Sequence, residues 1–391
     1  MRTLTAARLW NGQDLLDQPR IECEDGLVRS ISTGGSAGSD HFPAATLAPA
    51  FFDVHIHGAA GHDVMEATPE ALSKIGRFLA SRGTGSFLAT TVTAPLDMTL
   101  RALDGLARLI DHPDSIPANG PTTKPIGIHL EGPFLSHAKC GVQPKEHLLE
   151  PSIAAFDKLY EAAGGHARLM TLAPELPGAI ELAAHATSRG VRVSLGHSDA
   201  KAAETRAAIA AGAVSATHTF NAMRALDHRE PGILGTVLAT DSLFSELICD
   251  GIHTTPEIVK LWWRAKGPER AILVTDAMSA AGMPDGEYQL GGFAVQVADG
   301  KAMARGVLAG SVLTLDRALA NFIRFTGAPL EQALRLLTVN PAAMTGFPDR
   351  TGSIAVGQPA NLVALDAQGR LLGALIKGQI AAASSIEASV A

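Results

Sequence analysis

The chain has 391 residues, of which 46% are hydrophobic, 18% are charged and 5% are aromatic. This composition excludes a disordered chain, a coiled coil and collagen, and the length predicts one large domain with a smaller second one. The formal net charge of -7 gives no general attraction to nucleic acid or to anionic membranes, so we expect neither as a partner. An anionic ligand would need a local site of its own.

Cysteine usage and the N-terminal sequence indicate the compartment. The three cysteines, Cys23, Cys140 and Cys249, are far apart and form no CxxC pair, which argues against a disulfide framework. The N-terminus lacks the apolar core of a signal peptide, and later apolar stretches are interrupted by charges. We therefore expect a cytoplasmic protein.

The two ends of the chain have β-like patterns without a helical period. Residues 1–45 contain two such runs around an Asp25-Gly26 turn, and residues 352–391 contain two more around Gly369. Neither end has enough strands for a core of its own. We expect both ends to pair into one small β-sandwich domain, formed by residues 1–48 and 348–391.

The middle of the chain, residues 49–347, alternates strand-length apolar runs with longer helical patterns. Apolar residues recur at helical spacing in 69–83, 96–112 and 200–213, and a hairpin-like insert covers 291–310. Repeated βα units of this kind predict a (β/α)8 barrel of the TIM type, in the α/β class. The eight expected strands lie in 46–57, 85–93, 125–131, 167–175, 191–197, 214–220, 245–253 and 271–277.

His55 and His57 flank a single residue in the first of these runs. Side chains alternate along a strand, so both imidazoles should point to one face, towards the barrel axis. Such a pair is either a set of metal ligands or two histidines satisfied by hydrogen bonds.

Four more strand ends carry polar side chains that can bind a metal. Their convergence at the carboxyl end of one barrel would gather charge in a crowded cavity unless a divalent cation neutralised it. Mixed imidazole and carboxylate ligands suit Zn²⁺ best, and Fe²⁺, Mn²⁺ and Co²⁺ are alternatives. The four residues are Glu131, His197, His218 and Asp276.

Taken together, the motifs resemble the N-acetylglucosamine-6-phosphate deacetylases of the amidohydrolase superfamily, over essentially the whole chain. The HxH, GHS and VTDA elements fit many amidohydrolases when taken singly. The combination of HLEGPF (129–134), THTFNAM (217–223) and REPG (229–232) is far more specific to the deacetylases.

The resemblance implies roles for the metal-binding and catalytic residues. Glu131, His197 and His218 would hold the principal metal, while Asp276 would act first as a general base and then as a general acid. His253 would help to polarise the acetamide carbonyl. The pair His55 and His57, sharing Glu131, would form a weaker second site, so we expect one tight metal and a weaker second one.

The resemblance also implies substrate contacts. Arg229 would bind the sugar phosphate, for which the planar guanidinium is well suited. Many family members have a histidine in the loop after HLEGP, where this chain has Val142 and Gln143, so the role of Gln143 stays open. The remaining expected contacts are Asn221, Ala222, Leu308, Ala309, Gly310 and Ser311.

Other candidates have ordinary interpretations beside functional ones. His129 shares the face of Glu131 and either orients a ligand or packs in the core. His62 reaches the metal region or solvent. Cys140 is expected to be a buried small residue and stays outside the predicted site.

The expected reaction is hydrolysis of N-acetyl-D-glucosamine 6-phosphate to D-glucosamine 6-phosphate and acetate, in amino-sugar catabolism and cell-wall recycling. One alternative is a deacetylase of a related sugar phosphate, such as N-acetylgalactosamine 6-phosphate, because a C4 epimer needs only a small change of pocket. Another is a non-catalytic scaffold with the same fold. In the resembled family the arginine of REPG reaches across a subunit interface, so we also expect a homodimer.

Overall fold

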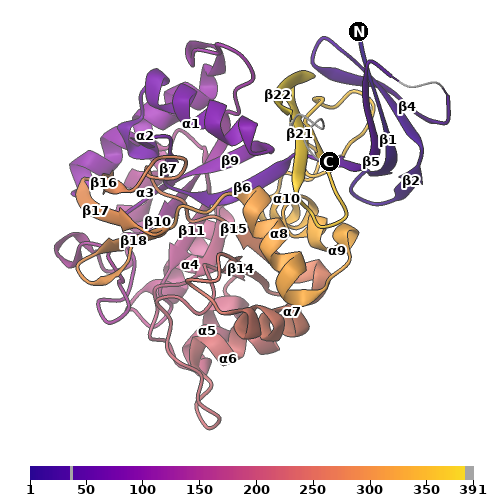
Figure 1. Cartoon of the computed structure of the whole chain (residues 1–391). Helices are drawn as coiled ribbons and strands as arrows, with labels where there is room; N and C mark the ends of the chain where they lie inside the picture. The colour runs from indigo at the N-terminus through magenta and orange to yellow at the C-terminus, as the bar shows by residue number, and fades with distance from the viewer. Residues whose placement is uncertain (36–37, 384–391) are drawn as a thin grey trace.

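The computed structural model describes residues 1–35 and 38–383 (Figure 1). Strands from both ends of the chain form one eight-stranded sheet in the order β22-β21-β20-β5-β1-β3-β4, with β2 paired to β1. The expected second domain built from both chain ends is therefore present. Its strands are β1 (Arg2–Trp10), β2 (Leu15–Asp17), β3 (Pro19–Glu24), β4 (Leu27–Thr33), β5 (Asp40–Pro49), β20 (Leu362–Leu365), β21 (Leu371–Ile376) and β22 (Gln379–Ala383).

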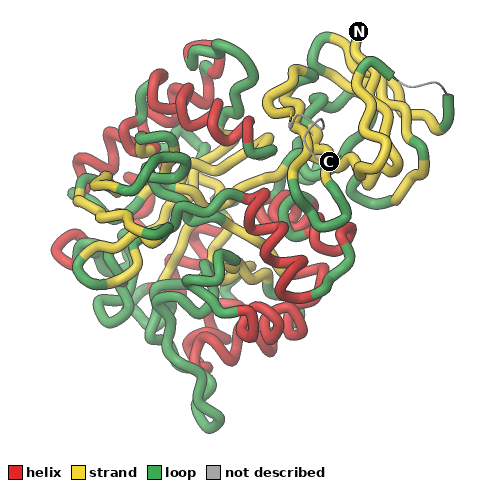
Figure 2. Tube along the Cα trace, viewed as in Figure 1, coloured by secondary structure: helices red, strands yellow, loops and turns green. Residues whose placement is uncertain are grey.

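The end sheet curls around its own apolar core. The backbone of Val28 in β4 is hydrogen-bonded to residues 357 and 358, which precede β20, so one edge of the sheet returns towards the other half. Leu4, Ile21, Leu47 and Leu362 are fully buried in this core. Figure 2 shows the sheet as a strand-rich body beside the helix-wrapped barrel. Residues 36–37 and 384–391, which the expected limits include, lie outside the described residues.

The second eight-stranded sheet is parallel throughout and has the order β15-β14-β13-β12-β11-β10-β9-β6. This order matches the chain order of a (β/α)8 barrel and confirms the predicted fold class. Its strands are β6 (Phe51–Ile56), β9 (Thr84–Thr91), β10 (Pro125–Glu131), β11 (Ala167–Leu172), β12 (Arg192–Leu195), β13 (Ala213–Ala216), β14 (Phe244–Ile248) and β15 (Ala271–Val274).

The barrel closes between β6 and β15 at a seam of individual hydrogen bonds. The amide of Asp276 donates to the carbonyl of His55 at 2.9 Å, and the amide of His57 donates to the carbonyl of Ala277 at 2.8 Å. Below them, the Thr275 hydroxyl donates to Asp53 Oδ2 at 2.6 Å. Residues of the predicted site thus take part directly in closing the barrel.

Helices cover the outside of the barrel. In α1 (Pro69–Ser81), Thr68 caps the first turn and Leu72, Ile75 and Leu79 are buried, as the spacing predicts. The other helices are α2 (Leu96–Asp111), α3 (Ile153–Ala162), α4 (Ala179–Ser188), α5 (Ala202–Ala210), α6 (Gly232–Ala239), α7 (Pro256–Arg270), α8 (Leu315–Thr326), α9 (Leu330–Arg335) and α10 (Val339–Thr345), with short 3-10 turns at Val64–Glu66, Pro113–Ser115 and Lys145–His147.

Two small antiparallel sheets lie outside these main bodies. One joins β7 (Gly58–Ala59) to β8 (His62–Asp63) directly after His57. The other is the predicted insert, which has four strands rather than a single hairpin and lies beside β7 in Figure 1. Its strands are β16 (Gly286–Leu290), β17 (Phe293–Ala298), β18 (Lys301–Ala304) and β19 (Val307–Leu308).

All eight expected barrel runs contain a strand, but several strands end earlier than expected. The first run, 46–57, is divided between β5 of the end sheet and β6 of the barrel. β12, β13 and β15 each stop two residues before the expected site residue, His197, His218 and Asp276 in turn, because the backbone there turns into the left-handed region. Within residues 1–35 and 38–383, no helix has the length and apolar character that crossing a membrane requires.

Candidate functional site

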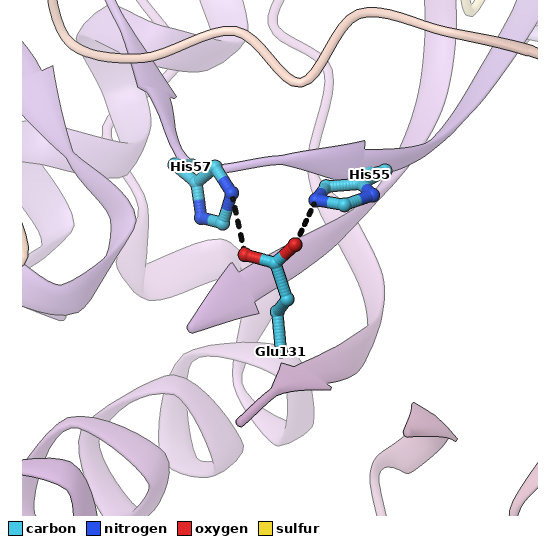
Figure 3. A group of neighbouring side chains, drawn as sticks. All are labelled: His55, His57 and Glu131. Carbon is cyan, nitrogen blue, oxygen red and sulfur yellow. Dashed lines mark ion pairs between the residues drawn. The ribbon is translucent and has the colours of Figure 1, made fainter. Parts of the chain in front are cut away.

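Glu131, the last residue of β10, lies at the centre of four histidines. Its Oε1 is 3.3 Å from His55 Nε2, 3.2 Å from His197 Nε2 and 3.1 Å from His218 Nε2. Its Oε2 is 3.3 Å from His57 Nε2. Figure 3 shows His55 and His57 reaching the two oxygens of this one carboxylate. The side chains form two candidate metal groups that share Glu131.

The first group contains the β6 pair, which we define as His55 and His57. His55 lies within β6 and His57 follows its last residue, so both rings point inward as the alternation predicts. His57 Nδ1 lies 3.0 Å from the carbonyl of Thr90, and His55 Nδ1 lies 3.2 Å from Glu246 Oε2. These outer contacts leave both Nε2 atoms facing Glu131.

The second group contains the strand-end pair, which we define as His197 and His218. Each stands two residues after its strand with a positive φ, 46° for His197 and 28° for His218. The His197 Nδ1 lies 2.9 Å from the carbonyl of Lys139, so this nitrogen is the donor. The turned backbone lets the two Nε2 atoms approach to 3.1 Å.

The hydrogen bonds of the outer nitrogens show that a cation fits this cluster. His57 and His197 each donate Nδ1-H to a backbone carbonyl, so in neutral rings their Nε2 atoms carry lone pairs. Lone pairs would then face the carboxylate of Glu131 at 3.3 Å and 3.2 Å. A cation between the nitrogen and oxygen atoms removes this repulsion, and the donor set is one that divalent transition metals accept.

Asp276 faces the same space from the end of β15. Its Oδ1 is 3.1 Å from His57 Nε2 and 3.6 Å from His55 Nε2, and its φ is 50°. Burial favours the neutral form, but the charge of His55 and the hydrogen bond from His57 outweigh it and lower the pKa of Asp276. Asp276 is therefore ionised at neutral pH and can accept a proton.

The β6 pair is held in a strongly anionic setting. Burial opposes a charged imidazole, yet hydrogen bonds with Asp276 and Glu131 outweigh it and raise the pKa of His57 to about 9. Burial also disfavours the charged form of His55, but the charges of Glu131 and Asp276 outweigh this effect and raise the pKa of His55. Without a metal, the cluster holds positive charge as protons, which a metal must displace.

Gln143 has a role that the sequence left open. Its side-chain amide donates to Glu131 Oε2 at 2.8 Å, and its carbonyl oxygen accepts the backbone N-H of Thr93 at 2.8 Å. The side chain is almost fully buried and also lines the cavity above the metal groups. Gln143 therefore holds the shared carboxylate in place from the side opposite the histidines of the strand ends.

His253 lies after β14 and is oriented by Asp250. Its Nδ1 is 2.6 Å from Asp250 Oδ2, and Asp250 also accepts the backbone N-H of His253. Burial disfavours the charged ring, but the hydrogen bond and charge of Asp250 outweigh it and raise the pKa of His253. The contact with Asp250 therefore favours the charged ring, the form in which Nε2 also carries a proton.

A cavity of about 270 Å³ opens above the metal groups. Four of the five candidate metal ligands line it together with Asp276, and several of the expected substrate contacts reach it. Apolar residues of the barrel loops and of the insert form one wall. The lining comprises His57, Val92, Glu131, Gly141, Val142, Gln143, His197, His218, Asn221, Ala222, His253, Asp276, Leu290, Phe293, Val307, Leu308 and Gly310.

Three predicted contact residues lie outside this lining. Ala309 is fully buried behind the wall, and Ser311 donates its hydroxyl to the carbonyl of Thr275 at 2.6 Å and its amide to the carbonyl of Asp276 at 2.7 Å. Ser311 thus supports the loop that carries Asp276. Arg229 is exposed on the loop before α6, which extends away from the barrel at the bottom of Figure 1.

His129, His62 and Cys140, for which the sequence allows two interpretations, all lie outside the cavity lining. His129 is fully buried, lies 2.9 Å from Thr171 Oγ1 through Nε2, and packs edge-on against His55 with ring centroids 4.7 Å apart. Burial lowers its pKa, so this ring is neutral and supports His55 by packing. His62 lies near Glu66 outside the cavity, and Cys140 is buried.

Sequence reasoning missed two buried carboxylates next to His55. Glu246 in β14 contacts the His55 ring, and Asp53 accepts the His55 amide at 3.3 Å as well as the Thr275 hydroxyl. The available signal was an acidic residue inside an otherwise apolar barrel run, in SELICD for Glu246 and in FFDVH for Asp53.

This geometry agrees with the comparisons to known proteins. Residues 46–386 match the amidohydrolase family, and the chain belongs to that family. Among its relatives, the predicted resemblance to sugar-phosphate deacetylases is confirmed. An N-acetylglucosamine-6-phosphate deacetylase of Bacillus subtilis is 38% identical over 92% of both chains. An N-acetylgalactosamine-6-phosphate deacetylase of Escherichia coli O157:H7 is 38% identical over 97% of this chain and 98% of that protein.

Solved structures point to the same group. A mutant of the N-acetyl-D-glucosamine-6-phosphate deacetylase from Mycobacterium smegmatis, solved in complex with N-acetyl-D-glucosamine-6-phosphate, has a TM-score of 0.90. The two chains are 33% identical, with 97% of this chain and 99% of that chain covered.

Proposed function

We propose that this protein hydrolyses N-acetyl-D-glucosamine 6-phosphate to D-glucosamine 6-phosphate and acetate. The observation that carries the proposal is the convergence of Glu131, the β6 pair and the strand-end pair beneath a cavity that Asp276 also faces. The named activities of the relatives at 38% identity supply the substrate class. The reaction would serve amino-sugar catabolism and cell-wall recycling in the cytoplasm.

Asp276 is the proposed general base and acid. Its ionised carboxylate accepts a proton from the water whose oxygen attacks the acetamide carbon. The carboxyl then returns that proton to the nitrogen as the C-N bond breaks, so that the amine leaves in a neutral form. The hydrogen bond of its backbone amide to His55 holds Asp276 at the seam during both transfers.

His253 is the proposed electrophilic partner. Asp250 keeps the ring protonated and directs Nε2 towards the cavity, where it donates to the acetamide oxygen as negative charge develops. The apolar wall formed by Val92, Leu290 and Phe293 excludes water from the acetyl methyl group. Asn221 and Ala222, at the other side of the cavity, are proposed to contact the sugar phosphate.

Zn²⁺ is the proposed metal, held tightly by Glu131 with the strand-end pair and more weakly by Glu131 with the β6 pair. A bound divalent cation supplies Lewis-acid polarisation and lowers the pKa of a bound water towards neutrality. The two groups share one carboxylate, and three protein ligands with an open position are typical of catalytic zinc sites.

A homodimer is the proposed assembly. Arg229 is exposed and does not line the cavity of its own chain, although the resemblance implies that it binds the sugar phosphate. In the proposed dimer, the partner subunit's Arg229 binds the phosphate. The loop before α6 extends away from the barrel, where a partner subunit could meet it (Figure 1).

The test is acetate release from N-acetylglucosamine 6-phosphate by purified protein, with N-acetylgalactosamine 6-phosphate in parallel. The 38% identity to a deacetylase of the galactosamine epimer makes that sugar the second candidate substrate. We expect metal-dependent release with the glucosamine epimer preferred. A preference for the other epimer would replace the proposed substrate. Failure of both substrates with metal bound would favour a non-catalytic scaffold.

A further inference from the structure

Glu246 is a fully buried carboxylate at the floor of the site. Its Oε2 lies 3.2 Å from His55 Nδ1 and accepts the backbone N-H of His218 at 3.3 Å. One oxygen therefore contacts a side chain of the β6 pair and the backbone of the strand-end pair. The other oxygen, Oε1, has no hydrogen-bond partner among the residues that the structure describes.

His55 differs from the other histidines of the cluster in its outer partner. The Nδ1 atoms of His57 and His197 lie against neutral backbone carbonyls, whereas that of His55 lies against a carboxylate. A metal ligand must be a neutral ring, and in that form the accepting carboxylate oxygen beside Nδ1 keeps the proton on Nδ1 and leaves the Nε2 lone pair directed at Glu131. The carboxylate also increases the basicity of the ring, which strengthens a metal ligand.

The charges around His55 require compensation beyond one cation. Glu131 and Asp276 face its Nε2 at 3.3 Å and 3.6 Å, and Glu246 faces its Nδ1, so three carboxylates surround one buried ring. A divalent cation held by Glu131 and the strand-end pair balances two of these charges. The third charge is that of Glu246, whose Oε1 has no hydrogen-bond partner among the described residues. Further positive charge at His55 stabilises it.

We propose that Glu246 is a positioning residue that makes His55 a competent ligand for a second divalent cation. The inference rests on the metal centre of the proposed function. Glu246 acts through the Nδ1 of His55 and does not touch the cavity, whose lining excludes it among the described residues. The hydrogen bond from the His218 amide holds the Glu246 carboxylate in a fixed position relative to the strand-end pair.

The test measures Zn²⁺ content by elemental analysis and Zn²⁺ affinity by chelator competition. The variants are Glu246→Gln, which keeps an acceptor but removes the charge, Glu246→Ala, His55→Asn, and the double variant His55→Asn with Glu246→Gln. Ser194→Ala is the matched control, because Ser194 is equally buried in the barrel and, among the residues that the structure describes, its hydroxyl is hydrogen-bonded to Thr217 alone. Far-ultraviolet circular dichroism checks that each variant is folded.

We expect the weaker equivalent to lose affinity by about 10-fold in Glu246→Gln and about 100-fold in Glu246→Ala, while the tight equivalent stays within about threefold. In the His55→Asn background, Glu246→Gln should add no further loss, because both changes act through one ring. The Ser194 control should bind as the wild type does.

Three results would overturn the inference. The first is a Zn²⁺ affinity equal to that of the wild type in both Glu246 variants, whether the wild type binds one equivalent or two. The second is additive losses of affinity for Glu246→Gln and His55→Asn. The third is loss of the tight equivalent together with the weaker one. The acetate assay on the same wild-type sample is read separately. A sample with the expected metal pattern but no acetate release would refute the proposed function and leave the role of Glu246 intact.

Discussion

The β6 pair and the strand-end pair bind the same carboxylate from very different backbones. His55 and His57 come from a regular strand and its first following residue, whereas His197 and His218 stand two residues beyond their strands with φ of 46° and 28°. A non-glycine residue in this region costs on the order of 1 to 3 kcal/mol. The strand-end pair, with Asp276 at φ 50°, therefore depends on its surroundings to stay in place.

The surroundings of the strand-end pair are a set of loop contacts. The amide of Ser198 donates to the carbonyl of Ala222 at 3.0 Å, which ties the loop after His197 to the loop after His218. Ser198 and Asp199 both donate to Glu175, at 2.7 Å and 2.6 Å. Strained residues persist where neighbouring contacts determine them and are typical of functional sites, so we expect the proposed catalysis to depend more on the strand-end pair than on the β6 pair.

The largest expected effect is at the strand-end pair itself. His197→Asn or His218→Asn removes one of three ligands of the tight group, and turnover should fall by about 1,000-fold or more, since metal activation supplies several kcal/mol. Steady-state kinetics with elemental analysis checks this. A variant that keeps its tight metal and a turnover within tenfold of wild type would remove the distinction between the pairs.

Asp276→Asn keeps the shape of the residue and its seam contacts but removes the proton acceptor. Turnover should drop by about 100-fold or more, the usual scale for a positioned general base, with metal content unchanged. The measurement is kcat beside metal analysis of the same sample. Turnover within a few-fold of wild type would take Asp276 out of the mechanism.

Arg229→Ala tests a residue that lies outside both pairs. We expect a loss of about 1.5 to 3 kcal/mol in kcat/KM for the phosphorylated sugar, the scale of a hydrogen bond to a charged group. Activity on unphosphorylated N-acetylglucosamine is the control and should hardly change. An equal loss on both substrates would make Arg229 a structural residue, and an active monomer in sedimentation analysis would contradict the proposed dimer.

Changing His55 and His57 together to asparagine tests the regular side of the comparison. The weaker metal equivalent should disappear and turnover should fall moderately, by about tenfold, because the group of Glu131 with the strand-end pair suffices to activate water. Metal titration distinguishes the alternatives. Two equally tight equivalents in the wild type, or loss of all metal from the variant, would reverse the ranking of the two groups.

The smallest effect on turnover, a few-fold at most, is expected for Asp53→Asn beside the β6 pair. Burial raises the pKa of Asp53 to about 7, despite the opposing hydrogen bond from Thr275. Between about pH 4 and pH 7 the unfolded chain releases a proton that the folded chain keeps, so the wild type loses stability relative to the variant as pH rises.

The expected change in that stability difference is on the order of 2 to 4 kcal/mol between pH 4 and pH 8. Urea unfolding of both proteins across this range measures it. If the free energy of unfolding changed with pH by the same amount in wild type and variant, the carboxyl of Asp53 would ionise as easily in the folded chain as in the unfolded one.

The two pairs also differ in how far they could be predicted. The HxH spacing fixes the direction of His55 and His57 as soon as a strand is assigned. His197, His218 and Asp276 could be assigned to strand ends, but the left-handed turns that aim them arise from contacts between loops. The barrel strands followed from periodicity and turn signals, which are local patterns. The pairing of the chain ends followed from the small number of strands at each end, too few for a core of its own.

Glu246, Asp53 and Gln143 could not be given their roles from the sequence. Glu246 is 191 positions from His55 along the chain, Asp53 is 222 positions from Thr275, and Gln143 reaches Glu131 from an irregular loop, so no spacing rule links these partners. A carboxylate in an apolar strand signals a buried partner without naming it. The place of Arg229 in the proposed dimer could not be derived from one chain either, because in that dimer its phosphate would be bound in the partner's cavity.

The seam between β6 and β15 has a consequence for the order in which this protein is completed during synthesis. Asp53 and Thr275 are separated by 222 residues, and the end sheet likewise joins β5 to β20. A nascent chain that has emerged only as far as α7 contains every histidine of the cluster but lacks the strand that closes the barrel. Because such long-range contacts form late, we expect the histidines to reach the arrangement seen here only after the final third of the chain has emerged.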